Sequence, residues 1–113
     1  MKVIIAGSRD YDDYDVLLEA INEAQFDIST VVSGGARGVD ALGERYASET
    51  NKALDIHKAD WKAHGRGAGP VRNKKMAENA DALIAIWDGQ SPGTKNMIET
   101  ATSKGLRVYV KRV

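Results

Sequence analysis

The sequence contains no cysteine, which excludes disulfide bonds, thiolate metal sites and a cysteine nucleophile. It also lacks an apolar run of membrane-spanning length, and its N-terminus lacks the pattern of a signal peptide. Its 16 basic and 16 acidic residues cancel, so the basic excess that is typical of dedicated nucleic-acid-binding proteins is missing. These absences predict a cytoplasmic protein with no membrane partner, and they make nucleic acid the least favoured partner.

The length and composition are those of one small globular domain. The chain has 113 residues, of which 42% are apolar, enough to build a core. No linker, repeat or low-complexity segment divides it, and the glycine-rich stretch at residues 65–69 is too short to do so. We therefore expect a single ligand-binding domain over residues 1–113.

Short apolar runs alternate with segments of helical periodicity along the whole chain. The predicted strands cover residues 3–6, 31–33, 53–58, 82–87 and 106–110. The predicted helices lie between them, from Asp13 to Ala24, Val39 to Thr50, Pro70 to Asn79 and about Thr94 to Gly105, with a loop over residues 59–69. This alternation predicts an α/β fold, a Rossmann-like three-layer sandwich with a mainly parallel five-stranded sheet.

The stretch from Val31 to Asp40 is the strongest indication of function. An apolar strand runs into the adjacent glycines Gly34 and Gly35, and a helix follows Gly38. Glycines let a ligand approach the backbone closely, and the first N–H groups of a helix suit a phosphate. The arginine at position 37 adds a guanidinium that can bind phosphate oxygens. A tight turn without a ligand is the alternative reading of this stretch.

In a parallel sheet, the residues that follow each strand meet at one edge, where ligands bind. The chain places glycines, arginines, hydroxyls and carboxylates at these positions. The predicted ligand-binding residues are therefore Gly7, Ser8, Arg9, Ser33, Gly34, Gly35, Arg37, Gly38, Asp40, Asp60, Trp61, Arg72, Asn73, Gly93 and Thr94. Their composition predicts a phosphate-bearing ligand.

Several of these residues have a purely structural alternative. Asp40 can stabilise the start of its helix or accept a hydrogen bond from a ribose hydroxyl. Trp61 can stack on a base or anchor its loop to the core. Arg72 can belong to a solvated basic face, and Thr94 can cap a helix. These alternatives stay open at the level of the sequence.

Other nucleotide chemistries lack their motifs. Neither the phosphate-binding loop of nucleotide triphosphatases nor the dinucleotide fingerprint is present. The two histidines, His57 and His64, lack metal-ligand spacing with any other ligand. We therefore predict no metal site and no bound cofactor.

The motifs together resemble one family of small proteins. The residues that carry the resemblance are Gly7-Ser8-Arg9, Ser33-Gly34-Gly35-Ala36-Arg37-Gly38-Val39-Asp40, Ala59-Asp60-Trp61, Ala68-Gly69-Pro70-Val71-Arg72-Asn73 with Met76, and Gly93-Thr94. The chain resembles a YspA-type (cpYpsA-related) member of the SLOG superfamily, which includes the DNA-processing protein A and Lonely Guy families. The resemblance implies a nucleotide-derived ligand, including ADP-ribose-like molecules, and a homo-oligomer.

The chain departs from the Lonely Guy pattern at one position. Those enzymes cleave the base from nucleoside monophosphates and carry a glutamate two or three residues after Gly-Thr. Here Asn96 and Met97 occupy those positions, and Glu99 lies nearly opposite Met97 on the helix. The favoured prediction is therefore a nucleotide-binding sensor, carrier or sequestering protein.

Two alternatives remain. One is an enzyme acting on a ribose N-glycosidic bond, with Asp60 and Asp88 as the candidate catalytic residues, Asp40 as a third and Glu99 as a weak fourth. The other is binding of single-stranded nucleic acid.

Overall fold

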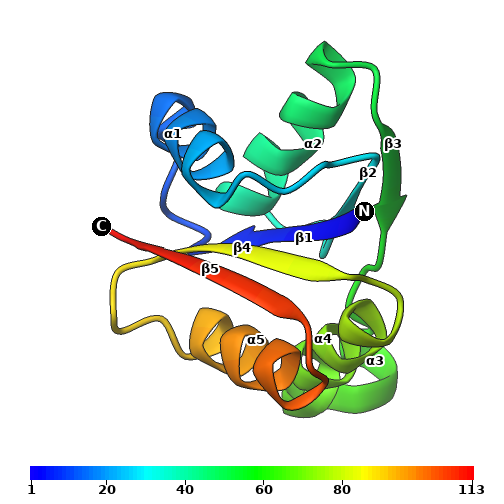
Figure 1. The fold of residues 1–113 in the computed structure, drawn as a ribbon. Helices are drawn as coiled ribbons and strands as arrows, with labels where there is room; N and C mark the ends of the chain where they lie inside the picture. The colour runs from blue at the N-terminus through cyan, green and yellow to red at the C-terminus, as the bar shows by residue number, and fades with distance from the viewer.

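The computed structural model describes residues 1–113 and contains one parallel sheet flanked by helices (Figure 1). The five strands are β1 (Lys2–Gly7), β2 (Thr30–Ser33), β3 (Ala53–Ile56), β4 (Ala82–Trp87) and β5 (Arg107–Arg112). The helices are α1 (Tyr14–Ala24), α2 (Val39–Glu49), α3 (Trp61–His64), α4 (Ala68–Glu78) and α5 (Pro92–Ser103), with the 3-10 segment η1 (Gly65–Gly67) between α3 and α4.

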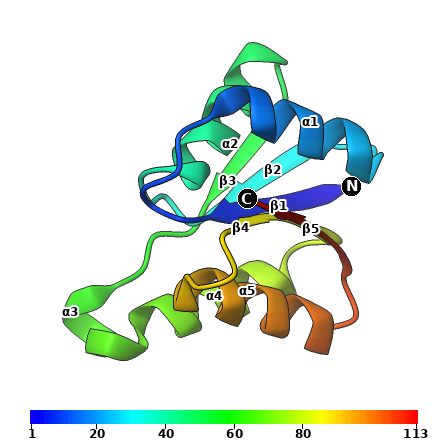
Figure 2. The ribbon, with the colours of Figure 1, turned by 90° about the vertical axis from the view of Figure 1, so that its left-hand side faces the viewer.

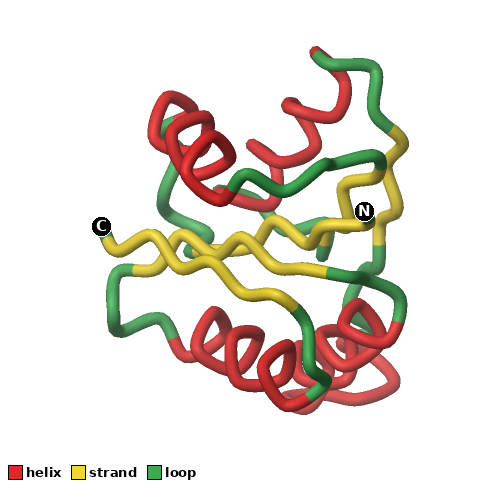
Figure 3. Tube along the Cα trace, viewed as in Figure 1, coloured by secondary structure: helices red, strands yellow, loops and turns green.

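The sheet lies between two layers of helices, with α1 and α2 on one face and α4 and α5 on the other (Figures 1 and 3). Neighbouring residues of β1 point to opposite faces. Ile5 belongs to the core cluster under α1 and α2, and Ile4 belongs to the cluster under α4 and α5. Because both faces are covered, β1 and β4 are continuous apolar runs.

The strand order is β3-β2-β1-β4-β5, and every pairing is parallel. The chain moves outward from β1 to the edge strand β3, then returns to β4 on the other side of β1. The order therefore reverses between β1 and β4, which is where open α/β sheets form a ligand crevice. The predicted α/β class and Rossmann-like sandwich are confirmed.

The prediction of a plain loop over residues 59–69 is wrong. Asp60 caps α3, because its side chain accepts a hydrogen bond from the backbone N–H of Ala63 at 3.0 Å. The helix α4 then begins at Ala68, so Pro70 is its third residue instead of its first. A proline fits anywhere in the first turn, since none of those N–H groups has a partner within the helix.

The other helix and strand boundaries move by a few residues. Pro92 is the first residue of α5, two residues before the predicted start at about Thr94, and its fixed backbone angle suits a helix start. The last strand runs to Arg112, two residues beyond the predicted end. None of the helices combines the length and the apolar character that crossing a membrane requires.

Candidate functional site

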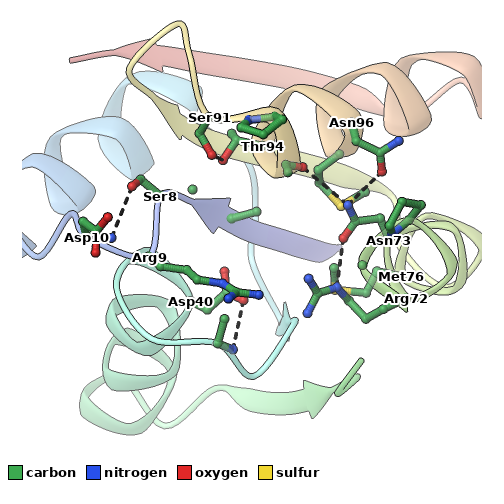
Figure 4. Close-up of a pocket in the computed structure, with 18 of the residues that line it drawn as sticks. Ser8, Arg9, Asp10, Asp40, Arg72, Asn73, Met76, Ser91, Thr94 and Asn96 are labelled. Atoms are coloured by element: carbon green, nitrogen blue, oxygen red, sulfur yellow. Dashed lines mark hydrogen bonds between the residues drawn. The ribbon is translucent and has the colours of Figure 1, made fainter. Parts of the chain in front are cut away.

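A pocket of about 700 Å³ lies at the reversal point, between the end of β1 and the starts of α4 and α5 (Figure 4). We call it the main pocket. It brings together residues from four separate parts of the chain. Its predicted members are Gly7, Ser8, Arg9, Asp40, Trp61, Arg72, Asn73, Gly93 and Thr94. Parallel strand ends and helix starts thus converge as the topology requires.

A second pocket of about 420 Å³ adjoins the main pocket on the side of β2 and β3. We call it the basic pocket. It contains the predicted residues Gly34, Gly35 and Arg37, together with Lys58 and Ala59. Four residues line both pockets and form the boundary between them; they are Arg9, Ala36, Trp61 and Arg72.

Gly38 connects the turn after β1 to the start of α2. Its φ of 74° is one that L side chains rarely adopt, and an added Cβ would collide with the backbone of Ser8 and Arg9. The backbone N–H of Val39 donates to the carbonyl oxygen of Ser8 at 3.2 Å. Gly38 was predicted to bind the ligand, but it lines neither pocket. In the structure it allows this close backbone contact.

Arg72 reaches from α4 to the glycine turn after β2. Its Nη1 donates to the carbonyl oxygen of Gly34 at 2.7 Å, and its Nε donates to Oδ1 of Asn73 at 2.9 Å. A Cβ on Gly34 would lie 2.5 Å from that Nη1 and 2.8 Å from Oδ2 of Asp40. Because Gly34 has no side chain, the guanidinium of Arg72 and the carboxylate of Asp40 can both lie close to its backbone.

Asp40 is a buried carboxylate in the wall of the main pocket, with 7% of its surface exposed. Its Oδ2 accepts a hydrogen bond from the backbone N–H of Ala36 at 3.2 Å. Burial raises the pKa of Asp40, although that hydrogen bond and the charge of Arg72 act in the opposite direction. Burial likewise lowers the pKa of the Arg72 guanidinium, and Asp40 opposes that change.

Two residues at the start of α5, Gly93 and Thr94, line the main pocket. Ser91 precedes the helix, and no side chain caps it. The N–H groups of Gly93 and Thr94 have no hydrogen-bond partner in the protein. The buried hydroxyl of Thr94 lies 3.2 Å from that of Ser91. This helix end thus offers free donors beside the positive end of the helix dipole.

Asn73 links α4 to α5 across the floor of the main pocket. Its Nδ2 donates to Oδ1 of Asn96 at 2.9 Å and to the carbonyl oxygen of Gly93 at 3.5 Å. The side chain of Asn73 is buried, so these contacts set its orientation (Figure 4). The predicted residue Asn73 therefore positions the free helix end of α5.

Trp61 and Arg9 stand at the mouth of both pockets. The Arg9 guanidinium lies 5.6 Å from the centre of the Trp61 ring, within range of a cation–π contact. Trp61 is 51% exposed and belongs to neither core cluster, so it does not anchor its segment to the core. Figure 2 shows α3 at the outer end of the α4–α5 layer, apart from the sheet.

Besides Gly38, two more predicted ligand-binding residues line neither pocket. Ser33 is buried beneath the glycine turn, where it donates to Oε2 of Glu44 at 2.8 Å and accepts from the N–H of Gly35 at 3.1 Å. Asp60 is occupied as the cap of α3. Both residues shape segments of the site instead of facing it, because their side chains satisfy nearby backbone or side-chain groups.

Asp88 does line the main pocket, and one of its carboxylate oxygens is hydrogen-bonded to the loop before α5. Its Oδ1 accepts from the backbone N–H groups of Gln90 and Ser91, each at 2.8 Å. These hydrogen bonds lower the pKa of Asp88, since they stabilise its charged form. Asp88 thus organises the loop before α5 as an ionised group.

The sequence prediction missed several pocket residues on α4 and α5. Asn96 and Met97 lie three and four residues after Gly93, and Met76 lies three residues after Asn73. Residues at these spacings share one face of a helix, so helical periodicity was the signal that could have identified them. No three of the His, Asp and Glu side chains come close enough together to hold a metal ion.

Comparison with known proteins places the chain in a family. The YspA, cpYpsA-related SLOG family matches residues 1–64. The chain belongs to this family. The family relation indicates nucleotide-related ligand binding or processing.

Two similar proteins extend the comparison beyond residue 64. The chain is 34% identical over 117 residues to the Gene 61 protein of Mycobacterium phage D29, an alignment that covers 95% of this chain and 93% of that protein. The X-ray structure of DNA processing protein A (DprA) from Streptococcus pneumoniae superimposes with a TM-score of 0.77 at 19% identity. That superposition covers 96% of this chain and 49% of DprA, so the chain spans about half the length of that protein. At this identity, the similarity shows the fold.

Proposed function

We propose that this SLOG protein binds a nucleotide or nucleotide-derived ligand, as a sensor, carrier or sequestering protein, and holds a ligand phosphate at the start of α5. One observation carries the proposal: the N–H groups of Gly93 and Thr94 are unpaired, and both residues line a pocket that also contains Arg9 and Arg72. Backbone donors at a helix start and arginine side chains are the groups that bind phosphate in proteins.

The rest of the main pocket suits a ribose and a base. Asn96 and Asp40 offer hydrogen-bonding groups to sugar hydroxyls, while Met76 and Met97 contribute apolar surface. The exposed ring of Trp61 at the mouth provides a face on which a base can stack. A pocket with a few convergent polar groups and apolar walls is typical of small-molecule sites.

The carboxylates favour binding over turnover. Cleavage of an N-glycosidic bond needs a carboxylate beside the ribose, to stabilise an oxocarbenium-like centre. Asp88 is committed to its loop, and Asp60 caps α3. Asn96 and Met97 line the pocket at the two positions where the Lonely Guy pattern has its glutamate. Neither side chain can supply the missing negative charge.

Asp40 supports a second candidate function, hydrolysis of a ribose N-glycosidic bond. It is a pocket carboxylate whose pKa is raised by burial, which is the property of a general acid. In that reaction Asp40 gives its proton to the departing base, and a water molecule adds its hydroxyl to the ribose carbon while its remaining proton restores Asp40.

Isothermal titration tests the binding function with adenosine and guanosine monophosphates and with ADP-ribose. Thr94→Val removes the hydroxyl beside the helix start, while the matched control Thr94→Ser keeps it. We expect the valine variant to lose about tenfold in affinity and the serine variant to bind as the wild type does. Absence of binding to the wild type at millimolar ligand would contradict the proposal.

Chromatography of the same mixtures after incubation separates a binding protein from an enzyme. Intact ligand supports the binding function. Release of free base by the wild type but not by Asp40→Asn would establish the hydrolase instead. Native mass spectrometry of the same complex gives its stoichiometry, and we expect a homo-oligomer.

A further inference from the structure

The two adjoining pockets differ in their balance of charge. The main pocket contains carboxylates as well as cations: Asp10, Asp40 and Asp88 accompany Arg9, Arg66 and Arg72. The basic pocket is lined by four cations, namely Arg9, Arg37, Lys58 and Arg72, and by no carboxylate. Its field therefore attracts anions more strongly than the field of the main pocket.

The cations of the basic pocket are only partly neutralised by the protein. Lys58 takes part in no salt bridge. Arg37 has one acidic partner, Asp10, at 3.5 Å, and both side chains are largely exposed. Such an exposed pair is weak, so Arg37 remains free to turn toward another anion.

The backbone of the glycine turn leaves room for these side chains. Gly35 has a φ of 71°, and an added Cβ would come within 3.0 Å of Cγ of Lys58 and 3.1 Å of Cγ2 of Ile56. The absence of a side chain at Gly35 lets the stem of Lys58 lie against the turn. Lys58 lines the basic pocket beside this turn.

We propose that the basic pocket binds a second phosphate of the same ligand, so that the ligand is a nucleotide with two phosphate groups that are not bonded to each other. This inference rests on the proposed function of the main pocket. Ligands of this chemical class include a nucleoside 3′,5′-bisphosphate and a dinucleotide with a 5′-phosphate.

The placement of the donors explains why the two phosphates are separate. Gly93 and Thr94 line only the main pocket, while Lys58 and Arg37 line only the basic pocket. Arg72, which lines both pockets, lies between the two sets of donors. A ligand that uses both sets therefore carries its phosphates on opposite sides of this arginine, with the sugar between them.

Isothermal titration with a graded set of probes tests this inference. The probes are adenosine and guanosine 5′-monophosphates, 5′-diphosphates, 3′,5′-bisphosphates and 5′-phosphorylated dinucleotides. The variant Lys58→Met keeps the length of the side chain and removes its charge. Lys62→Met is the matched control, because Lys62 is exposed on α3 and lines neither pocket.

We expect the wild type to bind a bisphosphate or a dinucleotide about tenfold or more tightly than the monophosphate. Lys58→Met removes this advantage and leaves monophosphate affinity unchanged, and Lys62→Met changes neither. Preference for the bisphosphate identifies a free small molecule as the source, whereas preference for the dinucleotide identifies a nucleic-acid fragment.

Three results would overturn the inference. The first is equal affinity of the wild type for the monophosphate and for both two-phosphate probes. The second is a gain from the 5′-diphosphate that matches the gain from the bisphosphate, which would place adjacent phosphates in one pocket. The third is an equal loss for all probes in Lys58→Met. Each leaves the proposed function standing, provided that the monophosphate binds; if no probe binds, both proposals fail.

Discussion

The main pocket and the basic pocket share Arg9 and Arg72 but differ in how their side chains are held. In the main pocket, Asn73 and Thr94 are buried and hydrogen-bonded within the protein. In the basic pocket, Arg37 and Lys58 are exposed. One pocket is therefore organised before any ligand arrives, while the other must order flexible side chains on binding.

This difference indicates how one site can combine selectivity for a particular ligand with electrostatic attraction of anions. Held polar groups recognise a particular geometry at little entropic cost, whereas exposed lysine and arginine side chains lose conformational freedom when they bind. Exposed cations also act at longer range and are screened by salt. We expect the main pocket to determine which nucleotide is bound and the basic pocket to add salt-sensitive affinity.

The largest effect is expected from Gly38→Ala, which should lower the stability of the protein and disturb both pockets together. The positive φ alone costs about 1–3 kcal/mol in a residue with a side chain, and the new Cβ also meets the backbone of Ser8 and Arg9. We expect the free energy of unfolding to fall by at least that amount in urea titrations. Gly67→Ala is the control, since Gly67 has a φ of −80° and open space around it. Equal stability of the two variants would contradict this account.

Replacement of the shared arginine should weaken both pockets at once. Arg72→Met removes a charged donor at their boundary, and we expect a loss of about 10- to 100-fold for monophosphates and bisphosphates alike. Titration calorimetry measures both affinities, and Arg107→Met, on exposed β5 surface, is the matched control. A loss confined to the bisphosphate would assign Arg72 to the basic pocket alone.

The pH dependence of stability should distinguish Asp40, the buried carboxylate of the main pocket, from a carboxylate on the surface. Because burial raises the pKa of Asp40, the folded protein keeps a proton that the unfolded chain releases near its ordinary value of 3.8. The free energy of unfolding therefore decreases as the pH rises from 3.8 through the folded-state pKa. We expect Asp40→Asn to remove this decrease in urea titrations across pH 3 to 8.

A surface carboxylate gives the opposite sign and serves as the control. The hydrogen bond from Arg45 lowers the pKa of Glu49, so its contribution to stability is present above its ordinary value of 4.5 and is lost as the pH falls through the folded-state pKa. Glu49→Gln should therefore remove a small loss of stability at low pH. The same slope in both variants would show that Asp40 is not distinguished by burial.

The smallest effect is expected at Arg37, an exposed cation of the basic pocket. Its ion pair with Asp10 is exposed, so Arg37→Ala should change the free energy of unfolding by less than about 0.5 kcal/mol. Bisphosphate affinity should fall a few-fold at low salt, and the difference should vanish as the salt concentration rises. A loss that persists at high salt would show that Arg37 is held in place like the residues of the main pocket.

Local sequence patterns predicted the fold and much of the candidate site. The apolar run at residues 82–87 and the glycine turn after Val32 are structures that a few neighbouring residues specify. Parallel strand ends must then meet at one edge, which is why Ser8, Arg9 and Gly93 were predicted to lie together. All three line the main pocket. The short helix at Trp61–His64 was missed because glycines follow it directly, although Asp60 was present as its cap.

Which way a side chain faces could not be predicted from those patterns. Asp60 and Asp88 were the candidate catalytic residues in the sequence, with Asp40 as a third. The structure places Asp40 in the pocket wall, Asp60 at a helix cap and Asp88 in a turn. Each assignment depends on which backbone N–H groups lie within reach of the carboxylate. Only the path of the chain around each residue determines that.

By itself, the sequence determined the order of the elements and the edge of the sheet at which polar groups gather, because hydrophobic periodicity and glycine placement act between near neighbours. The tertiary structure determined which of those polar groups line a pocket and which form hydrogen bonds with each other. The bond from Arg72 to Gly34 joins residues 38 positions apart, and the bond from Asn73 to Asn96 joins residues 23 apart. Such contacts exist only once α4 and α5 pack beneath β1, since packing alone sets the distances between helices. The same packing separates the main pocket from the basic pocket.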